Sequence, residues 1–178
     1  MSDDPAIAKT REWIDKIVIG LDLCPFAAAS IAKRGLRIVH CRARTEEDLS
    51  NAVADELGVL ESPEGRAIDG SLLVHPEVLT DFTAYNQFQD HCDVLLDEMS
   101  LVGEFQIASF HPSYRFADTA EIEAGNYTNR SPFPMLHLLR ESSVSRAVES
   151  HPDPAGIPGR NVRRLEALGV EAIRELVG

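Results

Sequence analysis

Short apolar runs that alternate with longer amphipathic segments constrain the fold of this chain more than any other feature. Three short runs read as strands, at residues 36–41, 71–75 and 105–110. Segments with apolar residues at helical spacing precede, separate and follow them: residues 6–19, 25–35, 45–57, 81–100 and 162–176. This alternation predicts β-α-β crossovers. We therefore expect an α/β fold with a small, mainly parallel sheet of three or more strands, flanked by helices.

One alternative fold stays open at this point. A ferredoxin-like α/β sandwich needs one more strand, which residues 114–117 could supply. Residues 134–139 and 144–149 are predicted to form two short helical turns, and residues 150–160 a linker rich in Pro and Gly. The helix after the first strand is expected to begin at an N-cap, Thr45. A chain of 178 residues is expected to form a single globular domain, 1–178.

Charge and cysteine content narrow the classes of partner and compartment. The formal charge of −12 argues against nucleic-acid and anionic-membrane partners, because both require a basic face. No apolar run approaches the roughly 20 residues that span a bilayer. The N-terminal sequence MSDDPAIAKT lacks the apolar core of a signal peptide. The three cysteines form no C-x-x-C pair and are odd in number, so we expect reduced thiols in a cytoplasmic protein.

Residues 111–132 form a long stretch that has neither a helical nor a strand period. Such a connection inside a compact domain is usually disordered or functional, and its aromatic residues argue against disorder. We therefore expect it to form the functional site. The candidate substrate-binding residues are Tyr114, Asn126, Asn129, Arg130 and Arg140. The candidate catalytic residues are His111, Cys24 and His137.

Each predicted strand ends at a histidine: His40, His75 and His111. In a parallel sheet the carboxyl ends of the strands meet at one edge, where ligands bind. Three converging imidazoles could hold zinc or iron. The alternative is that each histidine bonds a nearby loop carbonyl. We expect no bound metal, and His111 is retained as a general acid–base candidate.

Cys24 precedes Pro25, which is predicted to open a helix. At a helix N-terminus the free backbone N–H groups and the helix dipole favour a thiolate, which makes Cys24 a candidate nucleophile. The alternative is a small buried hydrophobe, as free cysteines commonly are.

Residues 126–132 lie just before the helical turn predicted at residue 134. Free N–H groups there, together with Arg130, would bind a carboxylate or phosphate. Alternatively, these residues shape a turn and Arg130 pairs with a carboxylate of the chain. On the predicted helix, His137 and Arg140 would share a face, either toward the site or toward solvent.

Three segments resemble the hallmark segments of the family named domain of unknown function 1415: LCPFA, FQIASFHPSYRFADT and NYTNRSPFPMLHLLRE. The resemblance extends from Trp13 to about Ala147. It implies no particular activity, cofactor or substrate, and His40 and His75 lie outside these segments.

Two classes of function remain open on the sequence. The leading hypothesis is a cytoplasmic enzyme that acts on a small anionic molecule in a pocket of His, Arg and Cys residues. The second is a non-catalytic module that binds a metabolite or a protein through the same stretch. The sequence indicates no particular cofactor.

Overall fold

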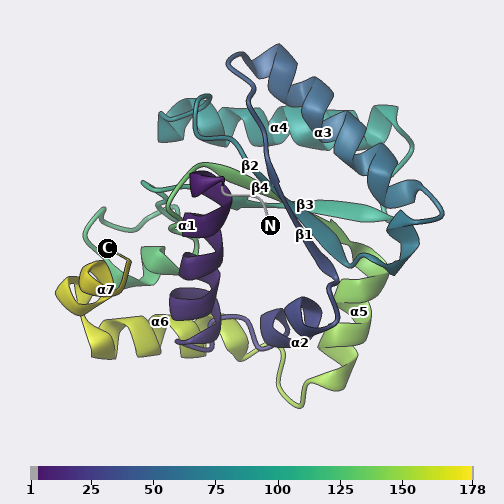
Figure 1. Cartoon of the computed structure of the whole chain (residues 1–178). Helices are drawn as coiled ribbons and strands as arrows, with labels where there is room; N and C mark the ends of the chain where they lie inside the picture. The colour runs from purple at the N-terminus through teal and green to yellow at the C-terminus, as the bar shows by residue number, and fades with distance from the viewer. Residues whose placement is uncertain (1–3, 178) are drawn as a thin grey trace.

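The computed structural model describes residues 4–177 and contains a four-stranded sheet with helices on both faces (Figure 1). Residues 1–3 and 178 of the predicted domain lie outside the described residues. The strands are β1 Leu36–His40, β2 Gly70–Val74, β3 Phe105–Phe110 and β4 Met135–Arg140. Their order in the sheet is β1-β2-β4-β3. β1 and β2 are parallel, whereas β4 is antiparallel to both of its neighbours. The α/β class is confirmed, but the sheet is mixed rather than mainly parallel.

Strand β4 accounts for the mixed sheet, and it corrects the helical turn predicted at residues 134–139. A short apolar run does not distinguish a buried strand from a buried helix. Here the run pairs with β2 on one side and β3 on the other, which satisfies its backbone groups along both edges. The helix predicted at residues 144–149 begins directly after this strand, as part of α5 (Glu141–Ser150). Residues 114–117, the extra strand of the ferredoxin-like alternative, form no strand.

The helices form two unequal layers around the sheet (Figure 1). α3 (Glu46–Glu61) and α4 (Phe82–Glu98) cover one face. The other face packs against α1, a π-helical segment η1, α6 and α7: Pro5–Trp13, Ile14–Ile19, Ile157–Leu168 and Val170–Val177. α2 (Ala27–Ala32) and α5 bury no residue. Two short 3-10 segments complete the structure, η2 Gly65–Ala67 and η3 Ala124–Thr128. Among residues 4–177, no helix is long and apolar enough to cross a membrane.

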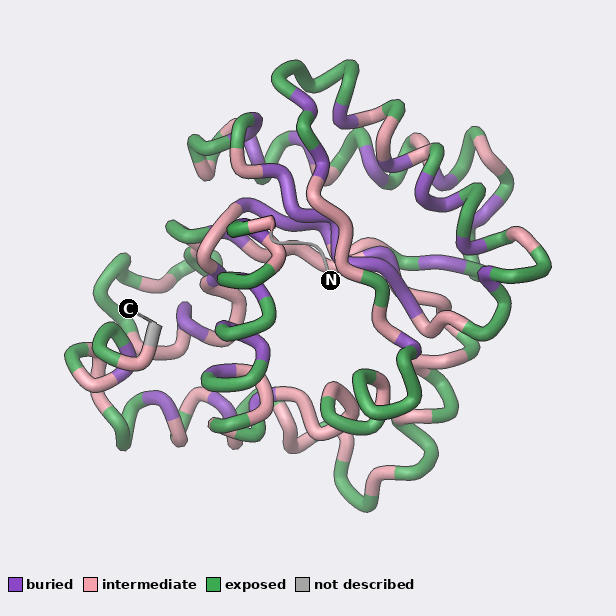
Figure 2. Tube along the Cα trace, in the orientation of Figure 1, coloured by how far each residue is buried: buried purple, intermediate pink, exposed green. Residues whose placement is uncertain are grey.

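Two hydrophobic clusters form the core, one on each face of the sheet. Successive strand residues point to opposite faces, so Leu73 joins the cluster under α3 and α4 while Leu72 joins the cluster near α1 and α6. Figure 2 shows the buried positions running along the strands and along the sides of α3 and α4 that face them. The two faces therefore present separate environments to the candidate residues.

Candidate functional site

The three strand-end histidines do not converge. His40 is the last residue of β1 and pairs in register with Val74, whereas His75 and His111 each follow the last residue of their strands. Because side chains alternate along a strand, His40 faces the α1 side of the sheet, where its Nδ1 lies 2.6 Å from a carboxylate oxygen of Asp4. His75 and His111 face the α4 side. Among residues 4–177, no group of three or more His, Cys, Asp or Glu side chains could hold a metal ion.

His75 and His111 are buried side chains that pack against the ring of Tyr85, at centroid distances of 6.0 and 5.0 Å. Both ring nitrogens of His111 are engaged. The Ser113 N–H donates to Nδ1 at 3.0 Å, and Nε2 donates to the Leu79 carbonyl at 3.2 Å. Burial lowers the pKa of His111, which favours the neutral ring. This arrangement leaves no nitrogen free for a substrate and favours the alternative in which His111 bonds a loop carbonyl.

Leu79, whose carbonyl accepts the hydrogen bond from His111, has an unusual backbone conformation. Its φ of 55° lies in the left-handed region, which a leucine adopts only when its surroundings hold it there. The hydrogen bond from His111 to its carbonyl is one such constraint. His75 holds the same loop by donating from Nδ1 to the Val78 carbonyl at 3.0 Å. Burial lowers the pKa of His75 to about 4, and its Nε2 has no hydrogen-bond partner among the described residues.

The irregular stretch is held in shape by its own polar residues. Asn126 is fully buried: its Oδ1 accepts from the Phe116 N–H at 3.0 Å, and its Nδ2 donates to the Ala120 carbonyl at 2.8 Å. Asn129 donates from Nδ2 to the Ser109 carbonyl of β3 at 3.0 Å. Asn126 and Asn129 were among the polar residues that marked this stretch as a candidate site. Their hydrogen bonds stabilise the conformation of the long loop.

Arg130 is tied to the same loop. Its Nε donates to the Tyr114 carbonyl at 3.0 Å and one terminal nitrogen donates to the Glu121 carbonyl at 2.7 Å. Its guanidinium carbon lies 4.6 Å from the centroid of the Tyr127 ring. The side chain of Tyr114 packs against Phe82, with centroids 5.3 Å apart. Two of the three guanidinium nitrogens thus donate to backbone carbonyls, so Arg130 links the segments of this loop.

His137 and Arg140 lie on opposite faces of the sheet, because positions three apart on a strand point in opposite directions. The prediction that they share a face is wrong for this reason. Arg140 donates to the carbonyls of Leu60, at 2.6 Å, and of Ile68, at 3.3 Å, and it stacks over Phe105. Arg140 is therefore a structural link between β4 and the segment after α3.

His137 differs from His111 and Arg130 because its side chain is not tied to a loop carbonyl within residues 4–177. It lies in the middle of β4, opposite Leu72 and Ala108, on the side of α1 and α6. Burial lowers its pKa to about 4, although the side chain is only half-buried. None of the described residues forms a hydrogen bond with it, and α2 and α5, on this side, bury no residue. The lowered pKa favours a neutral imidazole at His137.

Cys24 is not the N-cap of a helix. α2 begins only at Ala27, follows Phe26 as its N-cap and spans six residues. The predicted helix start at Pro25 is thus two residues early, and the dipole argument for a thiolate does not apply. Cys24 is nevertheless half-buried, whereas Cys41 and Cys92 are buried. Its role as a nucleophile stays a prediction based on access.

Arg160 and Asn161 on α6 were missed by the sequence reasoning. Asn161 is 5% exposed and donates from Nδ2 to the Leu23 carbonyl at 2.7 Å, next to Cys24. Its Oδ1 and the Nε of Arg160 are buried without a hydrogen-bond partner among the described residues. A buried polar atom without a partner is rare in folded proteins and invites explanation. The sequence feature that could have identified them is Asn161 itself, a polar residue on the same helical face as the buried Leu165, which lies four positions later.

The comparisons identify the family and nothing more specific. No curated protein and no solved structure matches the chain significantly. The family model described as "Protein of unknown function (DUF1415)" matches residues 5–175, nearly the whole chain. The resemblance seen in the three sequence segments is thereby confirmed, and the chain belongs to this family.

Proposed function

We propose that this protein is a cytoplasmic enzyme that acts on a small anionic molecule bound on the α6 side of the sheet. The observation that carries the proposal is the set of unpartnered polar groups on that side: the ring of His137, Nε of Arg160 and Oδ1 of Asn161. The three free cysteines suit a reducing compartment.

The charges on this side of the sheet define the class of ligand. With a pKa near 4, His137 is uncharged at neutral pH, so it accepts a proton or a hydrogen bond but does not attract an anion by charge. The Arg160 side chain carries a positive charge. Its buried Nε needs an acceptor, which a carboxylate or phosphate oxygen supplies. Asn161 Oδ1 needs a donor. The ligand therefore combines an anionic oxygen with a hydroxyl or amino group.

In the proposed enzyme, His137 acts as the general base or acid. Cys24 is the candidate nucleophile, and it follows Leu23, whose carbonyl accepts a hydrogen bond from Asn161. Arg130, assigned to the anion in the sequence-based hypothesis, is replaced in this role by Arg160. His111 is replaced by His137 because both ring nitrogens of His111 already form hydrogen bonds.

A non-catalytic binding module is the second candidate. One observation favours it: no described carboxylate bonds to His137, so nothing orients the ring or raises its basicity as in a catalytic pair. Such a module would bind the same class of ligand at the same groups without turnover.

The two candidates are separated by a screen of small hydroxy and amino carboxylates and their phosphate counterparts. Thermal denaturation identifies a binder, and mass spectrometry follows its conversion. We expect Arg160→Ala to abolish the thermal shift and His137→Gln to abolish turnover while binding persists. Arg163→Ala, an exposed arginine on the same helix, is the matched control. Binding without turnover in the parent protein would identify it as a non-catalytic binding module. A binder whose shift survives Arg160→Ala refutes the proposed site.

A further inference from the structure

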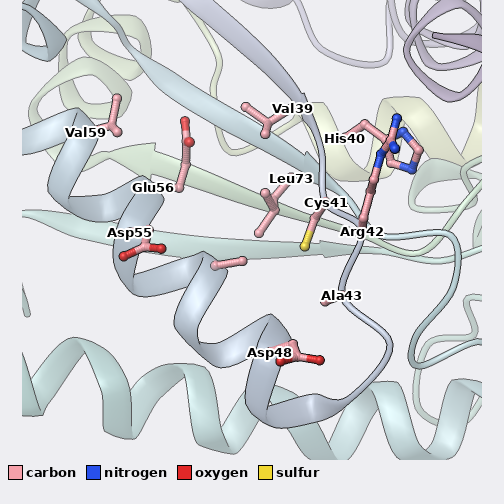
Figure 3. Close-up of a pocket in the computed structure, with 11 residues that line it drawn as sticks. Val39, His40, Cys41, Arg42, Ala43, Asp48, Asp55, Glu56, Val59 and Leu73 are labelled. Carbon is pink, nitrogen blue, oxygen red and sulfur yellow. The ribbon is translucent and has the colours of Figure 1, made fainter.

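A surface hollow of about 420 Å³ lies on the opposite face of the sheet, between the edge strand β1 and α3 (Figure 3). Its floor is apolar and includes Val39, Cys41 and Leu73. Its α3 wall includes a helical stripe at spacings of four, three and four residues, Asp48, Ala52, Asp55 and Val59, together with Glu56. In Figure 3, His40 and Arg42 extend away from α3, so the wall facing the floor is acidic and apolar.

The outer edge of β1 is not paired within the described residues. β1 is the first strand in the sheet order and pairs only with β2. The Gly35 carbonyl accepts from the Gly70 N–H, and the Cys41 N–H donates to the Val74 carbonyl. Because alternate residues of a strand direct their backbone groups to the same side, the N–H and C=O groups of Leu36, Ile38 and His40 point outward. They form no backbone hydrogen bond among residues 4–177.

We infer that this edge binds an extended basic peptide segment as an additional strand, whose side chains enter the hollow beside α3. A strand added to an open sheet edge gains its affinity from backbone hydrogen bonds and its specificity from pockets for alternate side chains. The outward N–H and C=O groups of β1 supply the backbone hydrogen bonds. The hollow between β1 and α3 supplies the pocket for side chains.

The charge of the α3 wall selects basic side chains. Asp48 and Asp55 are exposed and form no ion pair with any described residue. Glu56, which also lines the hollow, is already satisfied by Arg37 Nε at 2.7 Å and Ser71 Oγ at 2.6 Å. A lysine or arginine of the peptide would lay its methylenes on Ala52 and Val59 and place its charge beside Asp48 or Asp55. This surface lies on the other side of the sheet from His137, so the inference is independent of the proposed enzyme.

The test uses a fluorescent, end-capped peptide of alternating lysine and valine, about eight residues long, which is enough to span a strand such as β1. We expect saturable binding by fluorescence anisotropy and slower amide exchange at Leu36, Ile38 and His40. N-methylation of one alternate set of peptide nitrogens should weaken binding about tenfold or more, while methylation of the other set changes it little, because a strand uses one edge against β1.

Protein variants test the charge selection separately. Asp48→Asn and Asp55→Asn should each weaken binding by about threefold, the usual size for an exposed ion pair. Asp97→Asn, an exposed carboxylate on α4, should leave binding unchanged. The inference is overturned if the lysine–valine peptide does not bind, if both methylated peptides bind as tightly as the parent, or if a glutamate–valine peptide binds equally well.

Discussion

The hydroxyl of Tyr85 is predicted to hold together the ends of β3 and β4, and Tyr85→Phe is the change that tests it. Tyr85 has no exposed surface. Its hydroxyl donates to the Met135 carbonyl at 2.6 Å and accepts from the Phe110 N–H at 2.9 Å. Met135 and Phe110 are register partners on neighbouring strands. A phenylalanine keeps the ring, and with it the packing against His75 and His111, but removes both hydrogen bonds.

The expected loss of stability follows from these two contacts. The substitution removes one oxygen, so the change in packing is small. It withdraws the hydroxyl from a buried carbonyl and a part-buried N–H, and a buried group costs about 1–3 kcal/mol when it is left without its partner. We expect the free energy of unfolding to fall by about 2–4 kcal/mol, allowing for partial readjustment of the strands.

Urea denaturation of the parent and the variant measures this difference, and amide hydrogen exchange locates it. The Phe110 amide should lose protection more than amides in β1. Tyr114→Phe is the matched control, because the Tyr114 ring packs against Phe82 while its hydroxyl forms no hydrogen bond among the described residues. A loss below about 0.5 kcal/mol for Tyr85→Phe, equal to that of the control, would refute the reasoning.

Three further predictions concern pH, thiol access and the half-buried Arg140. Burial lowers the pKa of His75 and His137 to about 4, so the unfolded chain, with imidazoles near pKa 6.5, binds protons first as the pH falls. Stability is therefore full above about pH 6.5 and should decrease toward pH 4 by up to about 1.4 kcal/mol per pH unit for each histidine; urea denaturation across this range should show a shallower slope in His137→Gln. A limiting amount of alkylating agent should modify Cys24 before the two buried thiols, as peptide mapping will show, and burial also raises the pKa of both buried thiols. Arg140→Ala should lower the free energy of unfolding by about 2–4 kcal/mol, because it strands buried carbonyls, whereas Arg146→Ala, at an exposed position of α5, should change it by less than about 0.5 kcal/mol; equal losses would contradict the structural role of Arg140.

Local patterns in the sequence determined most of the secondary structure. The three predicted strands coincide with β1, β2 and β3 within one residue at either end. Thr45 caps α3 as expected, with its hydroxyl accepting from the Asp48 N–H. Capping and strand periodicity depend on residues a few positions apart, so the sequence contains them directly. Family membership was also readable from three short segments.

Tertiary pairing alone decided the identity of β4 and the positions of the site residues that depend on it. Residues 134–139 are apolar enough for either a helix or a strand, and only the gap between β2 and β3 selects the strand. That choice places His137 and Arg140 on opposite faces, and no local pattern fixes it.

The partners of the polar side chains were likewise decided by contacts between distant segments. Arg140 bonds a carbonyl 80 positions away, and Asn161 bonds one 138 positions away. A sequence shows which residues can donate or accept a hydrogen bond, but a buried group is satisfied by whichever segment the fold brings beside it. For this reason the sequence marked His111, Arg130 and Asn126 as able to form hydrogen bonds but did not show which backbone groups they would bond. The free groups of His137, Arg160 and Asn161 became visible only once the rest of the chain had been placed around them.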